Sequence, residues 1–293
     1  MQEHNFPRNI CGRLVTLADR DMIRGLIATY PKAKRNELSR RVCLAWNWLK
    51  PDGGLKEMSC RVLLLKLHRA NDIELPAPQS KNTNIRKRIP HTQEGDMKAP
   101  ILLPVGQLYP VRLRKVDSKQ DSLLWNELIE RYHYLGYTPL PGAQLRYFIE
   151  SPVGLLGAIG FSAAAWKVQP RDSWIGWTAS IQKQNLHFIV NNSRFLILPW
   201  VNSRNLASHI LSLCAKQLPL DWHQTYNYTP VLMETFVEKD RFAGTCYKAA
   251  NWIFVGMTKG RGKLDTTNAY AVPIKAIHLI PLHKHFRKIL QNL

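Results

Sequence analysis

The 293-residue sequence is poor in acidic residues: 21 Asp and Glu stand against 41 Lys and Arg, so the formal net charge is +20 at pH 7. The imbalance runs along the whole chain, because residues 1–100 hold 19 basic and 10 acidic residues, which leaves 22 and 11 for the rest. Such a surplus says nothing of the fold but favours a polyanionic partner, and nucleic acid, with DNA first, is the expected one.

Long hydrophobic runs are missing as well. No apolar stretch approaches the ~20 residues that cross a bilayer. Residues 1–8 lack the apolar core of a secretory signal. We therefore expect no membrane partner and a cytoplasmic location.

Cysteine pairs with metal-binding spacing are also absent. The five cysteines are scattered through the chain without a Cys-x-x-Cys motif: Cys11, Cys43, Cys60, Cys214 and Cys246. This pattern is typical of reduced thiols and argues against a structural zinc site, so no metal is expected.

Residues 1–76 are predicted to form a helical DNA-binding module. Apolar residues at helical spacing predict helices over residues 19–30, from about 35 to 46, and over 55–70, and a short extended segment follows at 73–76. Three helices and a strand in this order outline a helix-turn-helix or winged-helix module. The alternative is a small helical packing domain with solvated cations. The candidate nucleic-acid-binding residues are Arg40, Arg41, Lys56, Arg61 and Arg69.

The stretch 77–100 has no apolar periodicity and is rich in Pro, Asn, Thr and basic residues, so it is predicted to be a linker. A second, mixed α/β domain is expected over residues 101–293. Its predicted elements are a strand at 109–116, a helix at 122–134, a hairpin at 145–161, a buried strand at 195–201, a helix at 205–218, a strand at 231–237, a short helix from 244 and a strand at 253–257. The fold class is therefore α/β, of the α+β kind.

The stretch 229–263 gathers residues that carry chemistry. Glu234 lies on an apolar strand, Cys246 and Tyr247 lie on the following short helix, and the loop after the next strand holds Lys259, Arg261 and Lys263. A buried carboxylate must be paired or functional, and cations on a glycine-rich loop suit phosphate binding. The alternative is a core unit with a solvated basic hairpin.

Other candidate binding residues lie outside this stretch. His133 and Tyr134 are aromatic side chains that suit stacking on a base, and Asn192 and Arg194 suit hydrogen bonding to a substrate. The alternative for His133 and Tyr134 is a place in the core, where aromatic clusters are more often found. The alternative for Asn192 and Arg194 is that they simply form part of a turn.

The order of elements after residue 109 resembles the Gcn5-related N-acetyltransferase (GNAT) fold. The resemblance implies an acyl-coenzyme A-like donor whose pyrophosphate is bound at the start of the helix at 205–218, beside Ser203, Arg204 and Asn205. It further implies that Tyr247 protonates the leaving thiolate and that Glu234 supplies a base. The loop 201–205 lacks the glycines that the family uses there.

Longer runs resemble the DruA family of the Druantia anti-phage system. They are Leu-Ser-Arg-Arg-Val-Cys (38–43), Lys-Glu-Met-Ser-Cys-Arg-Val (56–62), Tyr-His-Tyr-Leu-Gly-Tyr (132–137), Pro-Gly-Ala-Gln-Leu-Arg-Tyr (141–147), Phe-Leu-Ile-Leu-Pro-Trp-Val (195–201) and Gly-Thr-Cys-Tyr-Lys-Ala-Ala-Asn-Trp (244–252). The resemblance implies a nucleic-acid-binding role in defence beside a helicase-like partner. The alternatives are an acyltransferase that modifies a nucleic acid or nucleotide, and a DNA-binding protein of a transposon. The sequence does not predict an oligomeric state.

Overall fold

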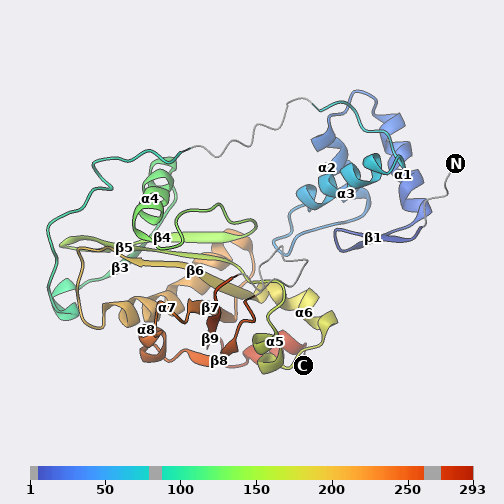
Figure 1. Cartoon of the computed structure of the whole chain (residues 1–293). Coiled ribbons are helices and arrows are strands. Elements are labelled where there is room, and N and C mark those ends of the chain that lie inside the picture. Colours follow the sequence, from blue (N-terminus) through green and yellow to red (C-terminus); the bar gives the residue numbers. More distant parts are fainter. Residues whose placement is uncertain (1–5, 79–87, 261–271, 293) are drawn as a thin grey trace. The chain divides into compact units, whose positions relative to one another are not determined.

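The computed structural model describes residues 6–78, 88–260 and 272–292. The chain divides into two compact units, Met1–Arg86 and Lys87–Leu293 (Figure 1). Each unit has a hydrophobic core of its own.

The first unit joins a small hairpin to three helices. It comprises β1 (Arg8–Ile10), β2 (Arg13–Val15), α1 (Leu17–Thr29), α2 (Arg35–Ala45) and α3 (Glu57–Arg69). Thr16 caps α1, because its hydroxyl accepts from the Asp19 amide while the Asp19 carboxylate accepts from the Thr16 amide. This reciprocal pair satisfies amides that a helix start leaves without intrahelical partners.

The three predicted helices are confirmed, but the strand expected after the third is not present at residues 73–76. There the Leu75 amide donates to His68 Nδ1 on α3, so the segment bonds to the helix instead of to a neighbouring strand. A β-hairpin, formed by β1 and β2, instead precedes the helices. Ile10 and Val15 hold it in place, since both side chains are buried in the core of this unit.

A seven-stranded sheet forms the frame of the second unit, in the order β3-β4-β5-β6-β7-β9-β8. Neighbouring strands run antiparallel except β6 and β7, which are parallel. The strands are β3 (Arg112–Lys115), β4 (Gln144–Ser151), β5 (Gly154–Ala163), β6 (Ile189–Ile197), β7 (Leu232–Glu238), β8 (Ile253–Met257) and β9 (Lys275–Pro281). The mixed α/β prediction is confirmed.

Helices cover both faces of this sheet. In Figure 1, α4 (Lys119–Tyr132) lies on one face, and α7 (Leu206–Tyr226) and α8 (Thr245–Ala249) lie on the other. The remaining helical segments are η1 (Val105–Leu108), α5 (Gln169–Ile175), α6 (Ala179–Asn185), η2 (Leu186–Phe188) and α9 (Phe286–Gln291). The helices α5 and α6 are inserted between β5 and β6, in a stretch for which the sequence analysis named no element.

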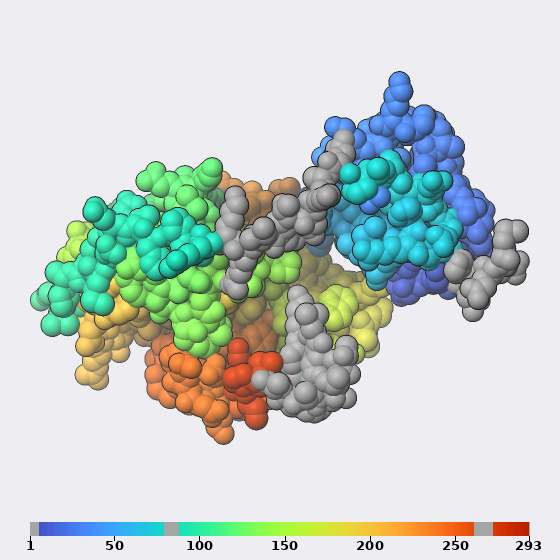
Figure 2. Space-filling view, turned by 45° about the horizontal axis from the view of Figure 1, so that its top comes forward, coloured from blue at the N-terminus to red at the C-terminus, as the bar shows by residue number. Residues whose placement is uncertain are grey.

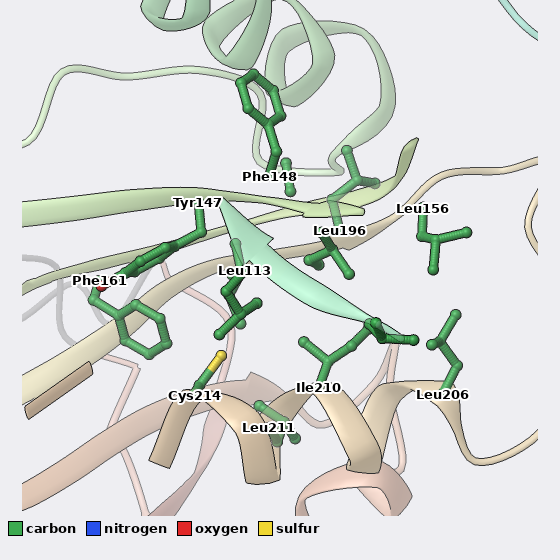
Figure 3. Packing of buried hydrophobic residues seen from close by; sticks show 14 of the residues in the cluster. Leu113, Tyr147, Phe148, Leu156, Phe161, Leu196, Leu206, Ile210, Leu211 and Cys214 are labelled. Carbon is green, nitrogen blue, oxygen red and sulfur yellow. The ribbon is translucent and has the colours of Figure 1, made fainter. Parts of the chain in front are cut away.

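The core follows the two-residue alternation of the strands. Tyr147 and Phe148 are neighbours on β4, yet Phe148 points toward α4, whereas Tyr147 points to the side of α7 (Figure 3). Phe161 and Cys214 are packed with Tyr147 on that second side, and all four side chains are at most 1% exposed. Burial on both faces explains why β4 holds three consecutive buried apolar residues, Tyr147, Phe148 and Ile149.

Two predicted boundaries were wrong. The central strand was expected at residues 195–201 but spans Ile189–Ile197, because the polar run that begins at Asn191 concealed its first half. The following helix was expected to end at residue 218, before Pro219, but continues to Tyr226. Trp222 lies beyond the proline and is fully buried, and its packing stabilises the extra turns.

Part of the expected linker at 77–100 is bonded to the second unit. The Thr92 amide and hydroxyl donate to the two carboxylate oxygens of Glu127 on α4, at 2.7 and 2.8 Å. In the space-filling view, the teal segment after residue 88 lies against the green of α4 and β4 (Figure 2). These bonds fix the segment on the sheet domain over residues 92–96.

Candidate functional site

The parallel ladder between β6 and β7 stops halfway along both strands. Residues Ile189–Asn192 pair with Leu232–Thr235, and the Asn192/Thr235 pair is the last one. Side chains that meet at this point come from stretches more than 40 residues apart, and four of the predicted site residues lie on or beside these two strands.

A buried polar cluster lies at the end of this ladder, on the face covered by α8. Tyr247 donates its hydroxyl hydrogen to Asn192 Oδ1 at 2.8 Å, and the Thr235 hydroxyl lies 3.4 Å from the same phenol oxygen. The Asn192 amide donates in turn to the Gly160 and Arg194 carbonyls. Burial raises the pKa of Tyr247, so its phenol stays protonated. The structure therefore brings together Tyr247 and Asn192, which the sequence proposed separately.

His278 belongs to the same cluster and was missed by the sequence analysis. It lies on β9 directly opposite Thr235, is 2% exposed, and its ring is 6.0 Å from that of Tyr247. Neither ring nitrogen has a hydrogen-bond partner within the described residues. Burial, with a smaller contribution from Lys248, lowers the pKa of His278 and keeps it neutral. The only signal in the sequence was a histidine inside an apolar strand.

Glu234 points to the other face of the sheet and is fully buried. One carboxylate oxygen accepts from Arg171 Nη1 and the other from the Ala165 amide, both at 2.8 Å. Burial opposes the charge of Arg171, but Glu234 and Asp172 outweigh it and raise the pKa of Arg171. Burial also raises the pKa of Glu234, against the opposing attraction of Arg171. This geometry gives Glu234 a structural partner and leaves its carboxylate poorly placed to accept a proton from a substrate.

Arg171 is the second residue that the sequence analysis missed. It is fully buried on α5, where its guanidinium also donates to Asp172 Oδ1 and to the Ala165 carbonyl. In the sequence, Arg171 lies close to several tryptophans. No local pattern there distinguishes a buried arginine from a solvated one.

Cys246 neighbours Tyr247 on α8 and is partly buried against the core. Burial raises the pKa of this thiol. A nucleophilic cysteine needs the opposite shift toward thiolate, so the surroundings of Cys246 suit a packing role.

A second cluster, which we term the aromatic–basic patch, consists of His133, Tyr134, Arg194, Arg241 and Phe242. His133 stacks on Tyr134 with ring centroids 4.8 Å apart, and Phe242 meets the same tyrosine edge-on at 5.1 Å. The Arg241 guanidinium lies over the Tyr134 ring, 5.0 Å from its centroid. Tyr134 and Phe242 are 36% and 47% exposed, so the patch offers aromatic surface to solvent.

His133 is held neutral within this patch. Its Nδ1 accepts from the Leu135 amide at 3.2 Å. Burial and the nearby charges of Arg194 and Lys275 lower the pKa of His133 to about 4. A predicted base-stacking residue and a predicted substrate-binding residue, His133 and Arg194, are therefore neighbours.

The loop before α7 lacks glycine, but one of its residues adopts a backbone conformation that glycine usually supplies. Asn205 adopts the left-handed conformation that usually favours glycine, with φ 64°. The Asn202 amide donates to the Ile101 carbonyl, so this backbone N–H of the loop is already used within the protein and is not free for a ligand. Arg204 is exposed, and the buried hydroxyl of Ser203 has no partner within the described residues.

Three of the five predicted cations of the first unit are engaged with acids. Arg40 and Arg61 both donate to Glu57, and Arg41 pairs with Glu37 and stacks over Tyr30. Lys56 and Arg69 have no acidic partner among the described residues. In the second unit Lys259 is exposed after β8, whereas Arg261 and Lys263 lie outside the described residues.

The described ranges hold no group of three or more His, Cys, Asp or Glu side chains that suits a metal ion. Within the same ranges, no helix combines the length and the apolar character needed to cross a bilayer.

The fold and these clusters define a basic protein with a helical first unit and a mixed-sheet second unit, whose candidate site lies at the end of the parallel pair β6–β7. The chain belongs to the family of the Druantia protein DruA, whose family model matches residues 66–287. Membership of this family places the protein in anti-phage defence.

Several solved acetyltransferases are similar in fold. The ribosomal-protein-S18-alanine N-acetyltransferase from Escherichia coli is 8% identical, with 59% of this chain and 94% of that chain covered and a TM-score of 0.36. An N-acetyltransferase from Staphylococcus aureus Mu50 is 13% identical, with 59% and 99% covered and a TM-score of 0.36. An N-acyl amino acid synthase from uncultured soil microbes is 11% identical, with 59% and 92% covered and a TM-score of 0.34. At such identities the likeness says nothing of activity. Among curated proteins, none matches the chain.

Proposed function

We propose that this protein is the nucleic-acid-binding component of its defence system, that DNA is its ligand, and that it acts beside a helicase-like protein. The observation that carries the proposal is the net charge of +20. Among the described residues, Lys66 and Arg69 are exposed on α3 and have no acidic partner. A surface of this kind attracts phosphate backbones and releases their counterions on binding.

The outward face of α3 supports this proposal. Its inward face buries Cys60, Leu63, Leu64 and Leu67, and the opposite face exposes Met58, Arg61, Val62, Lys66 and Arg69. Met58 and Val62 are 67% and 44% exposed, so apolar and cationic side chains alternate on one helix. Cations suit phosphates and apolar groups suit the methyl groups of thymine, which is the mixture that a groove-binding helix presents.

Binding is tested by fluorescence anisotropy with single-stranded DNA, double-stranded DNA and RNA over a salt series. We expect log K to fall linearly with log salt, and Lys66→Gln and Arg69→Gln each to reduce the slope by about 1. Lys32→Gln is the matched control, because Lys32 is equally exposed in the same unit but lies off α3. Absence of binding to every oligonucleotide at low ionic strength would refute the proposal.

The helicase-like partner is tested separately. The tagged chain is purified from cells that carry the whole defence locus, with and without nuclease treatment. A helicase-like protein retained after nuclease treatment supports a direct contact, and its loss points to tethering by nucleic acid alone.

An acyltransferase acting on a nucleic acid or nucleotide is the second candidate. One observation favours it: the Tyr247 hydroxyl lies at the end of the β6–β7 ladder and is hydrogen-bonded to Asn192. The engagement of both Glu234 oxygens and the raised pKa of Cys246 disfavour those two residues as base and nucleophile. Mass spectrometry of ligands that copurify with the chain is the test, since a bound acyl donor supports this candidate.

A further inference from the structure

Basic side chains without acidic partners gather around the start of α9, and we term them the α9 basic cluster. Its members are all exposed: His283, Lys284, His285, Arg287 and Lys288. Residues 266–293 contain four Lys or Arg and no Asp or Glu. Within the described ranges, no salt bridge joins a member of the cluster to an acid. Elsewhere in the second unit, Arg114 and Arg131 each pair with two carboxylates.

Helical spacing places the charges of the cluster on one side of α9. Phe286, Ile289 and Leu290 pack into a hydrophobic cluster together with side chains of α5. Arg287 and Lys288 lie between these positions and project away from that core. Lys284 lies one turn earlier, where the Phe286 amide donates to the His283 carbonyl. Side chains three and four positions apart are neighbours on a helix, so the three charges lie close together.

Contacts with α5 and α6 hold α9 in place. The Asn185 side-chain amide on α6 donates to the Leu290 carbonyl and to Asn292 Oδ1, at 3.0 and 2.7 Å. The Arg287 guanidinium lies 4.3 Å from the ring centroid of Trp174, and that indole stacks on Phe286. A cation–π contact positions the arginine but does not neutralise its charge. The cluster is therefore a fixed group of charges that no acid balances.

We propose that the α9 basic cluster is a second nucleic-acid-binding surface, which holds the phosphate backbone of DNA. This inference rests on the proposed function and adds the second unit to the surface that carries it. Like charges at helical spacing repel one another, so the cluster does not serve the stability of α9. Each strand of DNA carries a phosphate about every 3.4 Å along the helix axis, so neighbouring cations can contact successive phosphates.

His283 suits the same ligand. Its Nδ1 accepts from the His285 amide at 3.1 Å, so Nε2 is the ring nitrogen that carries a hydrogen. The ring is exposed, and an N–H group at this position can donate to a phosphate oxygen.

The composition of this surface favours phosphate contacts over membrane binding and over base recognition. The apolar side chains of α9 pack inward, whereas a helix that binds a membrane surface exposes its apolar face. On α3, by contrast, Met58 and Val62 are exposed among the cations. Phosphate contacts carry no sequence information, so we expect the α9 basic cluster to add affinity for DNA of any sequence.

The test uses the full chain and either single-stranded or double-stranded DNA, whichever binds more tightly. Fluorescence anisotropy over a salt series gives the slope of log K against log salt. Lys284→Gln, Arg287→Gln and Lys288→Gln are combined in one variant. We expect the slope to become shallower by about 2 to 3, because each phosphate contact contributes about 0.9 on duplex and about 0.7 on a single strand. DNA of a second, unrelated sequence should show the same change.

The matched control combines Lys98→Gln, Arg112→Gln and Lys119→Gln. These cations are also exposed, belong to the second unit and have no salt bridge among the described residues. Arg112 lies on β3, at the opposite edge of the sheet from β8. Both variants lose three positive charges, so the control should keep the wild-type slope if the contacts are local. Equal changes in the two variants would show an effect of net charge alone and would overturn the proposal.

A second variant guards against a loss of folding, because Arg287 also packs on Trp174. Lys284→Gln combined with Lys288→Gln leaves that contact intact and should make the slope shallower by about 1 to 2. Arg112→Gln combined with Lys119→Gln is its control. This pair replaces the triple variants if circular dichroism shows that the first of them is unfolded.

The proposal and the proposed function fail in different ways. Oligonucleotide binding with an unchanged slope in the folded cluster variant refutes the α9 surface and leaves the proposed function standing. Absence of all oligonucleotide binding refutes the proposed function itself. Pelleting with phosphatidylserine vesicles that the cluster variant loses, while its DNA slope stays that of the wild type, would identify a membrane-binding surface and overturn the proposal.

Discussion

Tyr247 and Asn192 are 55 residues apart in sequence and are joined by a hydrogen bond of 2.8 Å in the interior of the second unit. Asn192 is the last β6 residue that pairs with β7, and Tyr247 reaches it from α8. The bond therefore ties the end of the parallel ladder to the helix that covers it.

Tyr247→Phe should destabilise the protein by about 1–3 kcal/mol, because it leaves the buried Asn192 Oδ1 without its donor. Urea denaturation measures the change. Tyr226→Phe is the control: the Tyr226 hydroxyl bonds to Gln144 in an exposed setting, where water can replace it, so the cost should be smaller. A Tyr247→Phe variant as stable as the wild type would contradict the hydrogen bond. Loss of phage protection at unchanged stability would favour the acyltransferase.

Glu234→Gln should cost about 3–5 kcal/mol, since it leaves the buried Arg171 without the full negative charge that it faces. The matched control is Glu37→Gln, which breaks the solvent-exposed pair with Arg41 and should cost less than about 0.5 kcal/mol. Equal effects in the two variants, measured by chemical denaturation, would show that the Arg171–Glu234 pair is not buried as described.

Stability should fall between pH 6.5 and pH 4, partly because of His133. Its pKa is about 4 in the folded protein against about 6.5 for a free side chain, so across this range the unfolded chain takes up a proton that the folded state refuses. His133→Asn keeps an acceptor near the Leu135 amide but cannot titrate. We expect it to remove about 1–2 kcal/mol of the loss between pH 7 and pH 5.

The histidines His187, His209 and His278 also have a lowered pKa and contribute a slope of the same sign. The difference between wild type and His133→Asn isolates the contribution of His133. Parallel pH profiles for the two proteins, from urea denaturation, would argue against the shift.

Gly160→Ala should destabilise the protein by about 1–3 kcal/mol, because the added methyl group meets the Trp125 ring at 2.9 Å in a packed interior. Gly106→Ala is the control, since nothing lies within 4 Å of the added Cβ and the change should stay within about 0.5 kcal/mol. Thermal unfolding measures both. A neutral Gly160→Ala would mean that Trp125 does not pack against Gly160 as closely as described.

Most of the helices and strands could be predicted from local patterns of apolar residues in the sequence. The helical spacing of residues 19–30 and 55–70 predicted α1 and α3, and the apolar run at 231–237 predicted β7. The wrong boundaries arose where the local signal opposed the packing. Polar residues concealed the first half of β6, and Pro219 suggested an end to α7 although Trp222 lay beyond it in the core.

The candidate site was only partly predictable. Glu234, Tyr247, Asn192 and His133 were chosen by residue type, and the sequence left open whether Glu234 was paired or reactive. Arg171 and His278 escaped notice, because their significance depends on burial and on the neighbours that they meet in the fold.

The sequence by itself determined the strong positive charge and the alternation of helices and strands, since charge is additive and periodicity is a property of one segment. Only the tertiary structure decided that Arg171 pairs with Glu234 and that Tyr247 bonds to Asn192. The physical reason is that hydrogen bonds and desolvation depend on which distant segments are brought into contact, and the register of the strands sets those contacts.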